Sequence, residues 1–120
     1  MDIDKLIELT LKNRGCSASF NTGIFDPKVG FFASYKDNVM KVSLEDFTKA
    51  KAGYILLGFL NKNKKLIREH DNFIGTWINN SLVYIDVSKQ FHTEADCIKF
   101  ARENKQLFYY DAKKGIAIEP

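Results

Sequence analysis

Cys97 and His92 are the residues whose types and spacing come nearest to a catalytic pair. A helix expected to begin at Glu94 would place Cys97 in its first turn, where the helix dipole favours a thiolate nucleophile. His92 lies five residues earlier in the chain and is a candidate base for that nucleophile. The sequence offers no third group to orient the histidine. The alternative is a small buried thiol beside a histidine in a solvated connection.

The other acidic and metal-binding residue types do not form a motif. Asp86, Glu94 and Asp96 are scattered, and the last two suit the start of a helix. The two histidines lack the i, i+4 spacing of a metal site, and the seven glycines are dispersed rather than gathered in a phosphate-binding loop. Cys16 and Cys97 show no metal-ligand spacing and are expected to be reduced. We therefore expect no enzymatic activity, cofactor or metal.

Three basic groups are candidate contacts for phosphate or for an acidic protein surface. They are Lys62, Lys64, Lys65 and Arg68; then Lys99, Arg102 and Lys105; then Lys113 and Lys114. If the three groups converge in space, they form one cationic patch. Each group also has a local explanation, because cations favour the C-terminal ends of helices and short charged runs are commonly solvated.

The stretch from Phe73 to Val87 is expected to form the β-hairpin around which the chain is organised. Its central Asn-Asn-Ser residues tolerate the positive φ angles of a tight turn. A two-residue loop can fall at Asn79-Asn80 or at Asn80-Ser81, and only the second sets Trp77 opposite Tyr84. The two registers differ by two residues, so both keep the same two faces.

Alternation along this hairpin predicts which face is buried. The core face is expected to carry Ile74, Thr76, Ile78, Val83, Ile85 and Val87. Trp77 and Tyr84 then pair on the opposite side, either under a helix or at a binding surface. That pair, or Tyr109 with Tyr110 further along the chain, could anchor a protein interface, because aromatic residues concentrate binding energy.

The rest of the chain is expected to contribute short elements to the same sheet. Helices are predicted at 2–13, from Leu44 through an apolar run ending at Leu60, and from Glu94 to about Glu103, with Asn104 as a left-handed stop. The second helix can break near Gly53 or Gly58, and Leu66-Ile67 either continues it or opens a short further helix. Strands are predicted at 17–20, 30–35, 39–43, 106–110 and 115–118, with 36–38 as a turn between two of them. The order α-βββ-α-ββ-α-ββ predicts one α+β domain over residues 1–120, with a mostly antiparallel sheet and about three helices.

Length and composition limit the class of protein. The chain has 120 residues, of which 45% are hydrophobic and 28% charged, as in an ordinary soluble domain. A net charge of +3 permits nucleic-acid contact but excludes a mimic of the DNA phosphate backbone, which must be strongly acidic. No apolar run approaches the ~20 residues that span a bilayer, and the acidic N-terminus differs from a signal peptide. We expect a cytoplasmic protein with no membrane contact.

The C-terminal part of the chain resembles a pattern of small uncharacterised proteins from phages and other bacterial mobile elements. The resemblance lies in the segment GTWINNSLVYIDVSKQF, followed by EADCIKFARENKQLFYYDAKKG. The resemblance covers Phe73 to about Ile118. Small proteins in that setting include inhibitors of host defence, such as anti-restriction and anti-CRISPR proteins. The resemblance implies a host defence protein as partner, such as a CRISPR nuclease or its nucleic-acid complex.

Three functional hypotheses remain. The first is a non-catalytic protein that inhibits a host defence nuclease by direct stoichiometric binding. The second is a nucleic-acid-binding accessory or regulatory protein that uses the basic groups, and the third is a small enzyme around Cys97 and His92. The lack of a catalytic motif favours the first two, and the modest net charge favours the first over the second.

Overall fold

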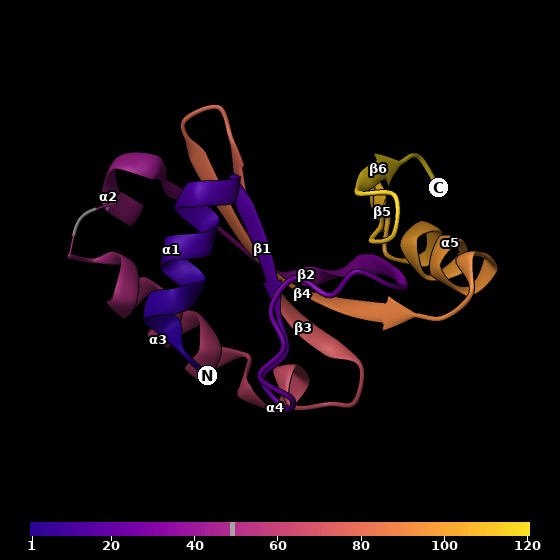
Figure 1. The fold of residues 1–120 in the computed structure, drawn as a ribbon, viewed down its shortest axis with the longest axis horizontal. Coiled ribbons are helices and arrows are strands. Elements are labelled where there is room, and N and C mark those ends of the chain that lie inside the picture. Colours follow the sequence, from indigo (N-terminus) through magenta and orange to yellow (C-terminus); the bar gives the residue numbers. More distant parts are fainter. Residues whose placement is uncertain (49) are drawn as a thin grey trace.

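In the computed structural model, which describes residues 1–48 and 50–120, five helices pack on one face of a six-stranded antiparallel sheet (Figure 1). The helices are α1 (Ile3–Asn13), α2 (Leu44–Thr48), α3 (Ala52–Lys62), α4 (Lys64–Ile67) and α5 (Glu94–Glu103). The strands are β1 (Gly15–Ala18), β2 (Phe31–Ser43), β3 (Asn72–Asn79), β4 (Leu82–Phe91), β5 (Tyr109–Asp111) and β6 (Ile116–Ile118), in the spatial order β1-β3-β4-β2-β5-β6. The predicted α+β class is confirmed, but the prediction of about three helices is wrong.

The β3–β4 hairpin forms in the second of the two expected registers. Trp77 lies opposite Tyr84 and Asn79 lies opposite Leu82, so the loop is Asn80-Ser81. Asn80 adopts φ 58°, a left-handed conformation that asparagine tolerates. The predicted core face is also confirmed. All six of its residues are buried: Ile74, Thr76, Ile78, Val83, Ile85 and Val87.

The helices cover that core face at its two ends. Leu6 of α1, Leu56 and Phe59 of α3 and Ile67 of α4 join the hairpin residues in the main hydrophobic cluster. Over the other end, α5 packs Cys97 and Ala101 against Ala33 of β2 and Tyr109 of β5. Because side chains alternate along a strand, Ala33 and Ile85 point to the same side of the sheet. The opposite side, which we call the outer face, is covered by none of the helices in the described residues.

The predicted turn at 36–38 is wrong, because β2 runs through it and both halves pair with β4. Ser34 lies opposite Ser88 and Val39 opposite Asp86, so the four residues 35–38 face the single residue Val87. The backbone N–H of Lys36 donates to Asn104 Oδ1 at 3.1 Å. In the same segment, Asn38 Nδ2 donates to Asn63 Oδ1 at 2.7 Å. These long-range contacts hold a polar bulge where local composition predicts a turn.

The predicted helix from Leu44 is divided into α2, α3 and α4, and its residue Lys49 lies outside the described residues. Its predicted cap is confirmed, since the backbone N–H of Asp46 donates to Ser43 Oγ at 3.1 Å. The helix is also less covered than expected. Tyr54 and Leu57 are 79% and 54% exposed, because α3 packs one face on the sheet and turns the other to solvent.

Smaller differences lie at the ends of elements. Asn104 has φ −92°, and the left-handed residue after α5 is Lys105 at φ 54°. The predicted strand at 106–110 shortens to β5, and β1 begins at Gly15 rather than at residue 17. No helix in the described part of the chain is long and apolar enough to cross a membrane.

Candidate functional site

The outer face carries an aromatic pair near the turn of the β3–β4 hairpin. The ring centroids of Trp77 and Tyr84 lie 5.6 Å apart, and Trp77 is 53% exposed. Lys41, the β2 partner of Tyr84, places its Nζ 5.5 Å from the centroid of the Tyr84 ring. The sequence left open whether this pair lies under a helix or at a surface, and the structure places it at a surface.

Further apolar side chains surround this pair on the outer face. Alternation places Val39 of β2, Leu82 of β4 and Tyr110 of β5 on the same side as Trp77, and all three are exposed. Together with Trp77 and Tyr84 they form what we call the outer-face patch. Several exposed apolar side chains on one sheet face, with polar residues among them, are typical of an interaction site.

Asp86 lies on β4 beside the aromatic pair, and its cross-strand partner on β3 is Gly75. Its Oδ2 accepts a hydrogen bond from Ser34 Oγ at 3.0 Å. Its Oδ1 would lie only 2.5 Å from a Cβ atom on Gly75, so the glycine leaves the space that the carboxylate occupies. Burial raises the pKa of Asp86 to about 6, although the hydrogen bond from Ser34 opposes that shift. The Asp86 side chain is half-buried, so its carboxyl group is only partly solvated in the middle of the sheet.

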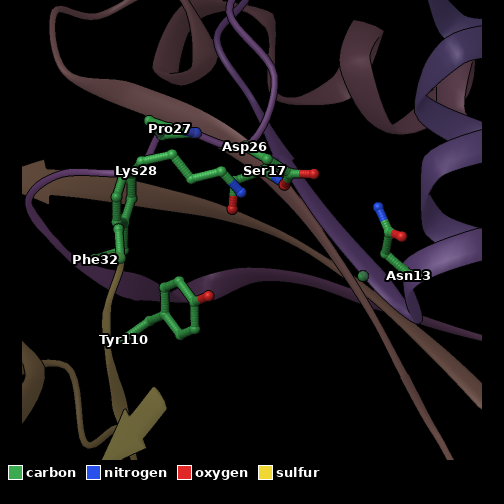
Figure 2. Close-up of a pocket in the computed structure, with 9 residues that line it drawn as sticks. Asn13, Ser17, Asp26, Pro27, Lys28, Phe32 and Tyr110 are labelled. Carbon is green, nitrogen blue, oxygen red and sulfur yellow. The ribbon is translucent and has the colours of Figure 1, made fainter. Parts of the chain in front are cut away.

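A pocket of about 350 Å³ opens on the same face (Figure 2). It is lined by Asn13, Gly15, Ser17, Asp26, Pro27, Lys28, Phe32, Tyr110 and Ala112. Strands β3 and β4 lie between β1, which carries Ser17, and β2, which carries Phe32. A pocket lined by residues of β1 and β2, which are separated by two strands, therefore indicates that the outer face is concave. Ser17, Gly75 and Asp86 are successive cross-strand partners, so one row of residues leads from the pocket to the carboxylate.

The loop before β2 closes one side of this pocket. Asp26 Oδ1 accepts a hydrogen bond from the backbone N–H of Ser17 at 2.9 Å, and Asp26 N–H donates to the Ser17 carbonyl oxygen at 2.7 Å. Asp26 adopts φ 48°, which turns the chain toward Lys28. Figure 2 shows Asn13 and Tyr110 on opposite sides of the space. The pocket thus combines polar groups with the aromatic ring of Tyr110.

The structure does not bring the three basic groups into one patch. Figure 1 shows the α3–α4 segment well apart from α5 and the β5–β6 hairpin. Lys62, Lys64, Lys65 and Arg68 are exposed on that segment, and the Arg68 guanidinium lies 5.2 Å from the ring centroid of Phe20. The other two groups lie on neighbouring elements, because α5 packs on β5. They comprise Lys99, Arg102, Lys105, Lys113 and Lys114, all exposed.

Cys97 and His92 lie in contrasting environments. Cys97 is fully buried on the inner face of α5, and burial, with the nearby Glu94 carboxylate, raises the pKa of its thiol to about 12. An activated thiolate requires a lowered pKa. His92 is exposed and lines a shallow depression that Cys97 does not reach. This environment counts against the Cys97–His92 hypothesis. Within residues 1–48 and 50–120, no cluster of three or more His, Cys, Asp or Glu side chains could hold a metal ion.

No protein-family model, curated protein or solved structure matches the chain. Sequence reasoning singled out Trp77, Tyr84 and Tyr110 of the outer face but treated Asp86 as one of several scattered acids. A signal for Asp86 existed in the hairpin, because the Asn80-Ser81 register sets it opposite a glycine.

Proposed function

We propose that this protein is a non-catalytic binding protein that engages a partner protein through the outer face. In the phage or mobile-element setting that its C-terminal sequence resembles, the partner would be a host defence nuclease, inhibited by direct stoichiometric binding in the bacterial cytoplasm. The observation that carries the proposal is the half-exposed Trp77, paired with Tyr84, on a sheet face that the described helices leave uncovered.

The chemistry of the outer face favours a protein partner. Interface cores are enriched in aromatic residues and depleted of charge, and a few aromatic anchors commonly carry most of the binding energy. The outer-face patch has that composition. A concave surface also gives more contact than a flat one, and the pocket beside Tyr110 offers a place for a protruding side chain.

The distribution of positive charge favours a protein partner over nucleic acid. Affinity for phosphates grows with the number of cations that contact the backbone together. The basic residues at 62–68 lie on a segment apart from those on α5 and the β5–β6 hairpin. A partner complex that contains nucleic acid is still compatible with binding through the outer face.

Affinity capture from a bacterial host, with and without nuclease treatment, tests this mode of binding. We expect the partner to be retained after nuclease treatment, lost by Trp77→Ala, and kept by the matched control Lys64→Glu, Lys65→Glu, Arg68→Glu. Loss of the partner on nuclease treatment, or with the charge-reversal control alone, would instead support the nucleic-acid hypothesis.

A titration of the captured nuclease tests the stoichiometric mechanism. We expect inhibition to rise linearly with added protein and to saturate near one molecule for each binding site. An enzyme that modified the nuclease would inhibit at far lower ratios and would continue to act with time. Such time-dependent inhibition would contradict a non-catalytic role.

A further inference from the structure

We propose that the outer face receives an arginine side chain of the partner protein, with the guanidinium held between the Asp86 carboxylate and the Trp77 indole. The proposal deepens the proposed function and rests on it, since it takes the partner to be a protein. It assigns a chemical class to the partner group at one position on the outer face.

The strand register sets the spacing of the two ligands. Trp77 lies opposite Tyr84, and Asp86 is two residues further along β4 on the same face. Diagonal cross-strand neighbours have Cβ atoms separated by about 7–8 Å or slightly less. A planar guanidinium between them can donate N–H hydrogen bonds to the carboxylate while it stacks on the indole. Gly75 lies opposite Asp86 and two residues before Trp77, and its missing Cβ leaves room for the Asp86 carboxylate on this side of the sheet.

The charge on Asp86 is not compensated within the described residues. Ser34 Oγ is its hydrogen-bond partner there, and no lysine or arginine of residues 1–48 or 50–120 forms an ion pair with it. Asp86 is half-buried, and a nearby cation stabilises a partly desolvated carboxylate because it compensates for the hydration that the carboxylate has lost. A partner cation would supply the missing group.

The aromatic rings of this face already accept a cation within the chain. Lys41 Nζ lies 5.5 Å from the centroid of the Tyr84 ring, on the side of the pair that faces β2. Trp77 lies on the β3 side and is exposed. Arginine fits the remaining position better than lysine, since its planar group can stack on a ring and still make two parallel hydrogen bonds to a carboxylate.

A titration with Nα-acetyl-arginine amide tests the inference without the partner. Trp77 is the single tryptophan of the chain, so its fluorescence reports on this position alone. The neutral isostere Nα-acetyl-citrulline amide is the matched control. We expect a saturable fluorescence change with the arginine probe and none with the citrulline probe. Asp86→Asn should weaken binding of the arginine probe by about tenfold, the range expected for removing one charged partner.

The pH dependence of probe binding provides a second readout. Because the carboxyl of Asp86 has a pKa of about 6, binding of the arginine probe should weaken as the pH falls through that value. The other charged groups that face this concave surface are Lys41 on β2, with Asp26 and Lys28 in the loop before it. The Asp86→Asn variant retains all three, so a pH dependence absent from that variant belongs to Asp86.

The outcomes separate this inference from the proposed function. Equal responses to the arginine and citrulline probes, or an Asp86→Asn variant that binds the arginine probe as wild type does, would overturn the arginine site. Capture of the partner would be unaffected by that result and would still depend on Trp77. The comparison of the two probes uses the wild-type protein, so it holds even if Asp86→Asn fails to fold.

Discussion

Asp86 shows how a single residue on the outer face opposes stability. Burial raises its pKa from 3.8 to about 6, so between these values the folded state holds a proton that the unfolded chain has released. This bound proton stabilises the folded state relative to neutral pH. The stabilisation is complete below about pH 4 and is lost as the pH rises through 6. At neutral pH the ionised carboxylate therefore costs stability. A residue that costs stability in this way is typical of a functional site.

Asp86→Asn should accordingly raise the free energy of unfolding at pH 7.5, by on the order of 1–3 kcal/mol. The gain should disappear below about pH 4, where the wild-type carboxyl is protonated in both states. Urea denaturation of both proteins at the two pH values measures the difference. A gain of equal size at both pH values would show that ionisation of Asp86 is not the cause.

Cys97 is a residue whose role is structural in this account. Cys97→Ser should lower the free energy of unfolding by ~1–3 kcal/mol, because a hydroxyl replaces a thiol in a fully buried position. Capture of the partner should be unchanged once the variant is folded. A variant that unfolds like wild type but no longer inhibits the nuclease would return the Cys97–His92 enzyme hypothesis to first place.

At the scale of elements, the β3–β4 hairpin depends on the fit between Gly75 and Asp86. Gly75→Ala should destabilise the protein by ~1–3 kcal/mol, since the new Cβ would lie 2.5 Å from Asp86 Oδ1 and the carboxylate must move. In an Asp86→Ala background the same substitution should cost less than about 0.5 kcal/mol. A double-mutant cycle by urea denaturation measures the coupling. Purely additive effects would contradict the contact.

Local sequence patterns were sufficient for some elements and insufficient for others. The faces of β3 and β4, the Ser43 cap of α2 and the bounds of α5 follow from residues close together in the chain, and all were predicted correctly. The segment Lys36–Asn38 has the composition of a turn, but pairing with β4 and side-chain contacts to Asn63 and Asn104 keep β2 continuous. No local pattern contains those partners.

The candidate site was also predictable only in part, because some of its features depend on local sequence and others on pairing between distant segments. The opposition of Trp77 and Tyr84 follows from one of the two hairpin registers. The concavity of the outer face follows from the strand order β1-β3-β4-β2-β5-β6, which is set by pairings between distant segments. The burial that raises the pKa of Asp86 depends on that order, and the hydrogen bond that opposes the shift comes from Ser34, which lies 52 positions earlier in the sequence.

At the scale of the whole molecule, the described helices and the outer face lie on opposite sides of the sheet. α1, α3 and α4 cover one end of the core face and α5 covers the other. The strands that run between the two ends connect the two hydrophobic clusters. This arrangement leaves Trp77 and its neighbours near the hairpin turn accessible to a partner, while Phe32, Phe73 and Ala112 form a small buried cluster elsewhere on the outer face. The basic residues at 62–68 lie on the helical side, away from Trp77. Substitutions there therefore serve as a matched control for substitutions on the outer face.

The rate of dissociation from the captured partner tests the central claim, binding through the outer face, most directly. It is measured for immobilised wild type, Trp77→Ala and the Lys64→Glu, Lys65→Glu, Arg68→Glu control. We predict that Trp77→Ala raises the dissociation rate constant by about tenfold or more, as expected for loss of an aromatic anchor. The control should remain within about twofold of wild type, because surface charges act mainly on association. An unchanged rate for Trp77→Ala, with faster dissociation of the charge-reversal control, would contradict the account.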